Sequence, residues 1–241
     1  MSWLNLDFVS GSTRLRSTLR RAGVTQALSS LRPFIGASDY EAKVDQALTS
    51  LVRPGDCVWD VGANVGLYTT RFATAVGPKG KVIAFEPIAT THAELSSRVS
   101  ALDNVQTHQF ALGASKSAIT LALHEDPTSP TNSLMHAPSG GAERTQQVDI
   151  VAGDELILEQ GVLTPSVIKI DTEGFEEDVL WGLRQTLRSP SLRGILVEVH
   201  FALLEARGYR RAPERLSSLL DDAGFRTRWV DPSHLLAERN A

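Results

Sequence analysis

The sequence predicts an α/β domain whose mostly parallel central sheet carries helices on both faces, preceded by a helical N-terminal segment. Two observations support this fold class. Short β-rich apolar runs alternate with amphipathic helical stretches from residue 56 onward, and a glycine-containing turn follows the first of these runs. Such alternation is typical of βαβ units, in which a crossover helix joins two parallel strands. The 241 residues are enough for one large domain of this kind.

The elements follow one another in a regular order. A helix over 40–51 ends before Pro54 and Gly55, because this pair stops a helix. We divide the chain there into a helical cap over 1–52 and a larger domain over 53–241. Strands are expected at 57–61, 81–85, 105–110, 117–124, 146–151, 166–171, 194–199 and, as the last strand, 225–230. Helices are expected at 67–76, 89–102, 174–187 and 213–223, and a flexible loop over 126–144.

The composition excludes several classes of protein. The net charge of −4 argues against a general nucleic-acid binder, so we expect no nucleic-acid partner. Cys57 is the single cysteine, which excludes an intrachain disulfide and a zinc site built from several cysteines. The sequence has no run of 18 apolar residues and no apolar signal-peptide core, which favours a cytoplasmic location.

The N-terminal segment differs in charge from the rest of the chain. Between residues 8 and 38 there is no acidic residue, but there are five arginines: Arg14, Arg16, Arg20, Arg21 and Arg32. An amphipathic helix that carries arginines can lie on an anionic membrane surface. The segment therefore predicts peripheral membrane contact, and a solvated helix face is the alternative.

The turn after the first strand is the most informative segment. Asp60, Gly62, Asn64 and Gly66 occupy every second position between that strand and the following helix. A glycine turn of this kind lets a helix N-terminus face a polar ligand. A dinucleotide site would instead have glycine at positions 62, 64 and 67, where this chain has Gly62, Asn64 and Leu67. Asn64 has two possible roles, a hydrogen bond to the ligand or a cap on the helix.

This turn resembles the first motif of class I S-adenosylmethionine-dependent methyltransferases. Glu86, at the end of the next strand, matches the acidic residue that holds ribose hydroxyls in such enzymes. A longer run, Ile-Lys-Ile-Asp-Thr-Glu-Gly-Phe-Glu over 168–176, resembles the signature of the FkbM-type family of these methyltransferases. Three further segments are similar to that family in the same order: Phe85-Glu86-Pro87, Ala111-Leu112-Gly113 and Leu196-Val197-Glu198-Val199-His200.

The resemblance covers about residues 56–200 and implies a Rossmann-like class I methyltransferase fold. It implies S-adenosylmethionine as the cofactor and O-methyl transfer as the reaction. The implied acceptor is a small molecule or glycolipid, with methylation of a sugar hydroxyl in a glycolipid or glycosylated secondary metabolite. The implied cofactor-binding residues are Asp60, Gly62, Asn64, Gly66, Glu86, Ala111 and Leu112.

The candidate catalytic residues stand at the ends of two strands. Asp171 and Glu173 follow the strand at 166–171, and Glu198 and His200 share a face because they are two residues apart on a strand. Ends of parallel strands meet at the site in this fold. We expect the four side chains near the transferred methyl, with His200 or Asp171 taking the acceptor proton. An unperturbed histidine, with a pKa near 6.5, is largely neutral at working pH.

Several alternatives stay open. Asp171 and Glu198 could hold a divalent cation, since hard cations prefer carboxylate oxygens. Glu176 and Glu177 fit the first turn of a helix, where acidic side chains complement the helix dipole. An N-methyltransferase, an NAD(P)-dependent oxidoreductase and a non-catalytic S-adenosylmethionine-binding module are the competing functions. The sequence does not determine the acceptor or the oligomeric state.

Overall fold

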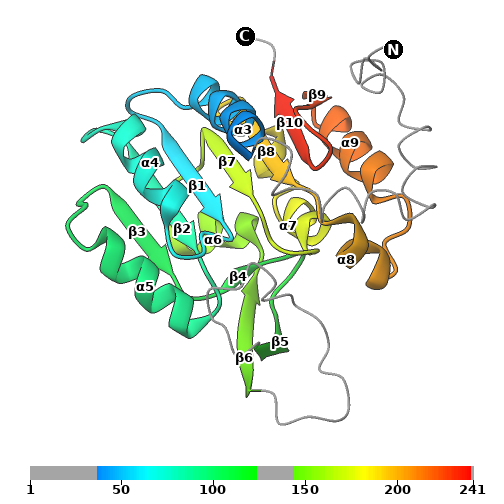
Figure 1. Ribbon diagram of the computed structural model, residues 1–241, viewed down its shortest axis with the longest axis horizontal. Coiled ribbons are helices and arrows are strands. Elements are labelled where there is room, and N and C mark those ends of the chain that lie inside the picture. The colour runs from blue at the N-terminus through cyan, green and yellow to red at the C-terminus, as the bar shows by residue number, and fades with distance from the viewer. Residues whose placement is uncertain (1–36, 124–143, 240–241) are drawn as a thin grey trace, which may run out of the picture. The chain divides into compact units, whose positions relative to one another are not determined.

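The structure is a computed structural model that describes residues 37–123 and 144–239 (Figure 1). The strands are β1 (Cys57–Val61), β2 (Lys81–Phe85), β3 (Val105–His108), β4 (Ala111–Leu112), β5 (Ser117–Leu123), β6 (Arg144–Val151), β7 (Val167–Ile170), β8 (Gly194–Glu198), β9 (Arg226–Trp229) and β10 (His234–Glu238). The helices are α3 (Ala37–Leu51), α4 (Leu67–Val76), α5 (Ala89–Val99), α6 (Gly153–Gln160), α7 (Glu176–Gly182), α8 (Phe201–Ala206) and α9 (Ala212–Asp222), with a 3-10 turn, η2 (Thr186–Arg188).

A seven-stranded sheet forms the centre of the domain, in the order β3-β2-β1-β7-β8-β10-β9. The neighbouring strands β3, β2, β1, β7 and β8 pair in parallel, whereas β10 runs antiparallel to both of its neighbours, β8 and β9. The chain moves outward from β1 to β3 and then returns to the other side of β1 with β7. The strand order therefore reverses at β1, and in open α/β sheets the ligand crevice lies beyond the carboxyl ends of the strands at such a point.

Alternate residues of the central strands face two different hydrophobic clusters. Trp59 and Val61 pack in one cluster with Leu156 of α6, Leu180 of α7 and Leu216 of α9. Val58, Val82 and Val167 pack in the other, with Val44, Leu48 and Leu51 of α3 and Phe72, Ala73 and Val76 of α4. Because successive side chains of a strand point to opposite faces, this alternation places helices on both faces of the sheet (Figure 1). The predicted fold class is confirmed.

A second, three-stranded sheet has the order β4-β6-β5. Its main part is the antiparallel pair of β5 and β6, in register from Ser117 opposite Ile150 to Leu123 opposite Arg144. Leu121 and Val148 pack with Ile88 in a small cluster of their own. The strands predicted at 117–124 and 146–151 are confirmed, whereas most of the loop expected at 126–144 lies outside the described residues.

Several elements differ from the sequence-based prediction, and α6, α8 and β4 were not predicted at all. The strand at 225–230 is not the last, because β10 follows it and inserts between β8 and β9. The short run His234–Glu238 was not predicted because its strand conformation depends on pairing with both neighbours. The helix expected at 174–187 is divided into α7 and η2. Gly182, where α7 ends, lies so close to Gly113 that an added Cβ would come within 1.9 Å of its backbone oxygen.

Only the end of the predicted N-terminal cap, from Ala37 on, lies within the described residues. Residues 1–36, which hold the five arginines and most of the predicted cap, lie outside the described residues, so the membrane contact stays a prediction. Contacts within the chain divide it after Lys43, and Val44–Leu51 pack with the larger unit. The domain boundary at residue 52 stays a prediction. None of the described helices is long and apolar enough to cross a membrane.

Candidate active site

A pocket opens at the carboxyl ends of β1, β2 and β7, where the strand order reverses. Its polar wall comes from the segments that follow these strands and includes Gly62, Asn64, Glu86, Asp171, Thr172 and Glu173. Its apolar wall comes largely from the second sheet and the start of α5 and includes Ile88, Ala111, Leu112, Ile119, Ile150 and Phe175. Five of the seven predicted cofactor residues line this pocket, and Asp60 and Gly66 do not.

Asp60 lies beneath the pocket with no exposed surface. Its carboxylate accepts a hydrogen bond from the Thr69 hydroxyl at 2.6 Å, and its Oδ1 lies 3.6 Å from the Lys169 ammonium. Thr69 belongs to the first turn of α4. Asp60 therefore ties the end of β1 to the helix that follows the turn, and supports the pocket from below.

The turn between β1 and α4 needs glycine for two physical reasons. Gly62 and Gly66 have φ angles of +77° and +85°, in the region that L side chains rarely adopt. At Gly62, an added Cβ would also come within 1.8 Å of the backbone oxygen of Asp171. The absence of a side chain thus lets the ends of β1 and β7 approach each other beside the pocket.

Asn64 also has a positive φ, of +50°. Its side-chain Oδ1 accepts a hydrogen bond from the backbone N–H of Val65 at 2.7 Å, which holds the residue in this local conformation. The N-cap residue of α4 is Gly66, which has no side-chain cap. Of the two roles left open for Asn64, the structure does not show the helix cap, and the side chain lies at the pocket wall.

Glu86 is a buried carboxylate at the pocket wall. Its Oε2 accepts a hydrogen bond from the backbone N–H of Asn64 at 3.0 Å, and its Oε1 accepts one from Ile88 at 2.9 Å. Burial raises the pKa of Glu86 to about 7, against the lowering effect of these two hydrogen bonds. Each oxygen keeps a further lone pair, so the ionised carboxylate can accept two more hydrogen bonds.

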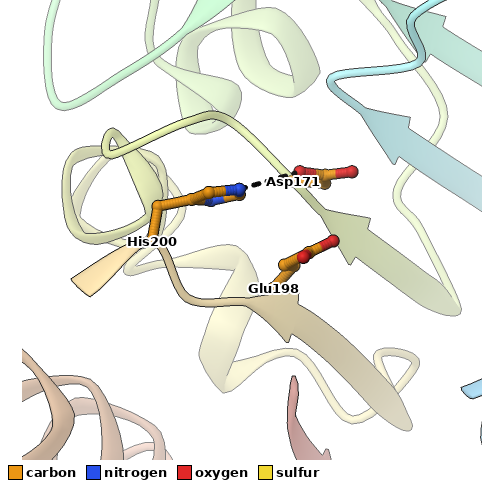
Figure 2. Close-up of side chains that lie close together, drawn as sticks. All are labelled: Asp171, Glu198 and His200. Atoms are coloured by element: carbon orange, nitrogen blue, oxygen red, sulfur yellow. Dashed lines mark ion pairs between the residues drawn. The ribbon is translucent and has the colours of Figure 1, made fainter. Parts of the chain in front are cut away.

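The four predicted catalytic residues are close together at the ends of β7 and β8. The Nε2 atom of His200 lies 3.2 Å from Glu173 Oε2 and 3.8 Å from Asp171 Oδ1. Figure 2 shows Asp171 and Glu198 at neighbouring strand ends, with the His200 ring beside Asp171. Asp171 and Glu173 line the pocket at the ends of β1, β2 and β7, whereas Glu198 lines a smaller pocket with Tyr68 and Lys169.

The charge on His200 differs from the expectation. Burial lowers the pKa of this imidazole, but the hydrogen bond of Nδ1 to Glu176 and the charges of Glu176, Glu173 and Asp171 outweigh it and raise the pKa to about 9. The prediction of a largely neutral His200 at working pH is therefore wrong. The carboxylates around the ring, which the sequence could not bring together, hold the imidazolium.

The neighbouring carboxylates differ from each other in acidity. Burial raises the pKa of Glu173 to about 7, although the charge of His200 lowers it. Burial also raises the pKa of Glu198, but the hydrogen bond and charge of His234 outweigh it and lower the pKa to about 2. Glu198 is thus a permanent anion near neutral pH, and Glu173 titrates there.

Sequence reasoning missed two cations in this cluster. The ammonium of Lys169 lies 3.2 Å from Asp171 Oδ2 and 3.3 Å from the backbone oxygen of Gly62. Burial lowers the pKa of Lys169, but the charges of Asp171 and Asp60 raise it by more, so the ammonium stays protonated. The second cation is His234, whose Nε2 lies 3.4 Å from Glu198 Oε2. Lys169 stands within the 168–176 signature and could have been found, whereas His234 becomes visible only once β10 is paired with β8.

Glu176 and Glu177, which were assigned to the first turn of the helix, begin α7 as expected. Glu176 has no exposed surface. Its Oε1 accepts a hydrogen bond from the backbone N–H of Gly174 and also lies 2.8 Å from Nδ1 of His200. Glu177 points elsewhere and pairs with Arg215. Glu176 therefore supports His200 in addition to beginning the helix, while Glu177 does not contribute to the pocket.

This fold and this pocket define a class I S-adenosylmethionine-dependent methyltransferase. Residues 60–227 match the Methyltransferase FkbM domain. Because the match spans more than half of the 241 residues, the chain belongs to the FkbM methyltransferase family. S-adenosylmethionine is the methyl donor of this class.

Two curated proteins illustrate the similarity. Hexuronic acid methyltransferase AglP of Haloferax volcanii is 28% identical over 188 residues, which cover 78% of this chain and 70% of the relative. The 31-O-demethyl-FK506 methyltransferase FkbM of Streptomyces tacrolimicus is 27% identical over 206 residues, which cover 68% of this chain and 76% of the relative. Among solved structures, a precorrin-6y C5,15-methyltransferase from Geobacter metallireducens superposes with a TM-score of 0.50 at 11% identity, covering 83% of this chain and 88% of that one. At this identity the superposition shows the fold alone.

The residues around the pocket fit the methyl donor. The hydroxyl oxygens of Thr91 and Thr172 are buried and have no hydrogen-bond partner among the described residues, and both threonines line the pocket. Unpaired buried hydroxyls are costly, so they favour a polar ligand that completes their hydrogen bonds. Glu86 offers acceptors for ribose hydroxyls, and the apolar wall suits an adenine ring.

Proposed function

We propose that the chain is an O-methyltransferase that methylates a sugar hydroxyl of a glycolipid or a glycosylated secondary metabolite. The observation that carries this proposal is the group of Asp171, Glu173 and His200 beside the cofactor pocket. Methyl transfer to an alcohol needs a group that removes the hydroxyl proton, and an acidic cluster next to the donor can do so. The names of the two curated relatives, which refer to a hexuronic acid and to a demethylated oxygen of FK506, support a hydroxyl-bearing acceptor.

The roles of the pocket residues follow from their positions. Glu86 accepts the ribose hydroxyls, and the backbone near Gly62 and Asn64 borders the amino-acid part of the donor. Ala111 and Leu112 border the adenine ring together with the apolar wall. Asp60 and Gly66, which do not line the pocket, shape the turn that carries these groups.

The chemistry requires alignment, exclusion of water and removal of one proton. Bound S-adenosylmethionine supplies a methyl group that its sulfonium already activates. The acceptor oxygen forms a bond to the methyl carbon while the carbon–sulfur bond breaks, and the electron pair of that bond neutralises the sulfur. We assign the acceptor proton to Glu173, because its carboxylate reaches the pocket and is not held by Lys169, as Asp171 is. His200, 3.2 Å from Glu173, stabilises the charge of that carboxylate.

Two other functions make different predictions. An N-methyltransferase would act on an amine, which is largely protonated near neutral pH and must also lose a proton before its lone pair attacks, so the N-methyl product distinguishes it from an O-methyltransferase. A non-catalytic module would bind the donor without turnover. The side chains at positions 64 and 67 argue against a nicotinamide dinucleotide.

The test uses the full chain, methyl-labelled S-adenosylmethionine and a panel of acceptors: glucuronic acid, its methyl glycoside, glucose, rhamnose and glucosamine. We expect release of S-adenosylhomocysteine with a hydroxyl acceptor, and a methyl ether that resists alkali in mass spectrometry. An alkali-labile methyl ester or an N-methyl product would contradict O-methylation of a hydroxyl. Donor binding without turnover on any acceptor would favour the non-catalytic module.

A further inference from the structure

Three side chains at the ends of β7 and β8 offer a set of metal ligands. One ligand atom each from Asp171, Glu198 and His200 lies within 4.8 Å of the other two (Figure 2). Donor atoms about 2.2 Å from a six-coordinate cation lie between about 3 and 4.4 Å apart, and His200 Nε2 and Asp171 Oδ1 are separated by 3.8 Å. We propose that Asp171, Glu198 and His200 bind a divalent cation.

The side chains around these three residues hold each of them in an orientation that suits a ligand. Glu176 pairs with Nδ1 of His200 at 2.8 Å, which leaves Nε2 directed at Asp171 and Glu173. A carboxylate on the far nitrogen of a histidine is the usual support of a metal-binding imidazole. Glu176 is fully buried and is the first residue of a helix, so this support is rigid.

The two carboxylate ligands are supported in the same way. Lys169 contacts Asp171 through Oδ2, which leaves Oδ1 on the side of His200. His234 contacts Glu198 at 3.4 Å and is itself held by Asp231, whose Oδ2 lies 2.8 Å from Nδ1 of His234. Each ligand therefore has a supporting partner: Glu176 for His200, Lys169 for Asp171 and His234 for Glu198.

The charge of the cluster also favours a cation. Five carboxylates, of Asp60, Asp171, Glu173, Glu176 and Glu198, are close to three cationic side chains, Lys169, His200 and His234. The second oxygen of Glu176 is buried without a hydrogen-bond partner among the described residues. A divalent cation would take the place of the proton on Nε2 of His200 and offset the remaining negative charge.

The mixed ligand set selects among cations. Mg²⁺ prefers oxygen ligands only, whereas an imidazole with two carboxylates suits a transition metal such as Mn²⁺. We therefore expect Mn²⁺ to bind more tightly than Mg²⁺. The cation would lie between the cofactor pocket, which Asp171 lines, and the smaller pocket, which Glu198 lines. Its role in lowering the pKa of an acceptor hydroxyl rests on the proposed function, but its binding does not.

The experiment measures Mn²⁺ binding to the full chain by calorimetry and by the loss of the free Mn²⁺ signal in electron paramagnetic resonance. We expect one site with a dissociation constant below about 1 mM. Glu198→Gln and His200→Gln should abolish that site, and Glu176→Gln should weaken it by about 10–100-fold, because it removes only a supporting group. Glu94→Gln, an exposed carboxylate on α5, is the matched control and should leave binding unchanged.

Thermal unfolding and S-adenosylhomocysteine binding are measured for every variant, so that a misfolded protein is recognised, and both ligand variants are made because one of them could fail to fold. No Mn²⁺ binding by the unaltered chain, or unchanged binding by either folded ligand variant, would overturn the proposal. If S-adenosylhomocysteine binding and methylation of an acceptor persist in that case, the proposed function stands without a metal. If Mn²⁺ binds but no acceptor is methylated, the metal site survives and the proposed function does not.

Discussion

The carboxylate of Glu86 accepts a hydrogen bond from the backbone N–H of Asn64 at 3.0 Å and thereby ties the end of β2 to the turn after β1. Both residues line the pocket at the ends of β1, β2 and β7. The residue proposed to hold the ribose thus also holds the turn that borders the rest of the donor. Changes at Glu86 should affect donor binding through both contacts.

We expect Glu86→Gln to weaken S-adenosylhomocysteine binding by about 1.5–3 kcal/mol, or roughly 10–150-fold, because hydrogen bonds to a charged acceptor are lost. Calorimetric titration measures this. Glu94→Gln, which changes an exposed carboxylate of α5, serves as the control. Unchanged affinity in Glu86→Gln would remove the ribose assignment.

Donor binding should also depend on pH through Glu86. Burial raises its pKa to about 7, so the carboxyl of the free protein is increasingly protonated as the pH falls below 7 and loses acceptor capacity. The dissociation constant of S-adenosylhomocysteine should rise by up to about tenfold per pH unit below 7. Titrations between pH 5.5 and 8 measure the slope. The slope should disappear in Glu86→Gln, and a slope that persists there would assign the titration to another group.

Gly62→Ala should destabilise the protein more than a glycine substitution with the same backbone strain elsewhere. The new Cβ would meet the Asp171 backbone oxygen at 1.8 Å, so the ends of β1 and β7 must separate. We expect a loss of about 2–5 kcal/mol from overpacking and left-handed strain together. Gly161→Ala has a similar φ, of +68°, in the left-handed region, and open space around it, so it should lose only about 1–2 kcal/mol. Denaturant unfolding compares the two, and equal losses would contradict the close-contact argument.

Asp154→Ala should lower stability without affecting the site. This buried carboxylate of α6 accepts hydrogen bonds from the backbone N–H groups of Gln185 and Thr186 at 2.8 and 2.9 Å, and from the Thr186 hydroxyl at 2.7 Å. Its removal leaves buried donors unpaired, at a cost of about 2–4 kcal/mol. The melting temperature should fall by roughly 4–16 °C. S-adenosylhomocysteine affinity at low temperature should stay as in the unaltered protein, because Asp154 does not line the pocket.

Glu173→Gln should reduce methyl transfer by roughly 10²–10⁴-fold once an acceptor is identified, while the affinity for S-adenosylhomocysteine stays within a few-fold. The glutamine keeps the size of the side chain but cannot take a proton. Single-turnover rates across pH separate this effect from product release. Glu177→Gln, on the neighbouring helix and paired with Arg215, is the control for a nearby lost charge. Near-normal rates in Glu173→Gln would assign the proton to another residue.

The order of strands and helices was predictable because its signals are local. The alternation of apolar runs and helical stretches, and the glycines around the β1 turn, act within a few residues. They located β1, β2, β7 and β8, and with them Glu86, Asp171 and His200 at strand ends. The sequence by itself also determined the family, through motifs in the right order. Motif order says which strand ends carry polar groups, although it does not give their distances.

Only the tertiary structure decided what depends on residues far apart in the chain. The strand β10 exists because it pairs with β8 and β9 on both sides, and this pairing brings His234 to Glu198. The second sheet supplies the apolar wall of the pocket in the same way. The positive charge on His200 follows from the three carboxylates that the packed chain places around it, whose effect outweighs burial. Pairing and burial are properties of the packed chain, so a pattern along the sequence does not contain them.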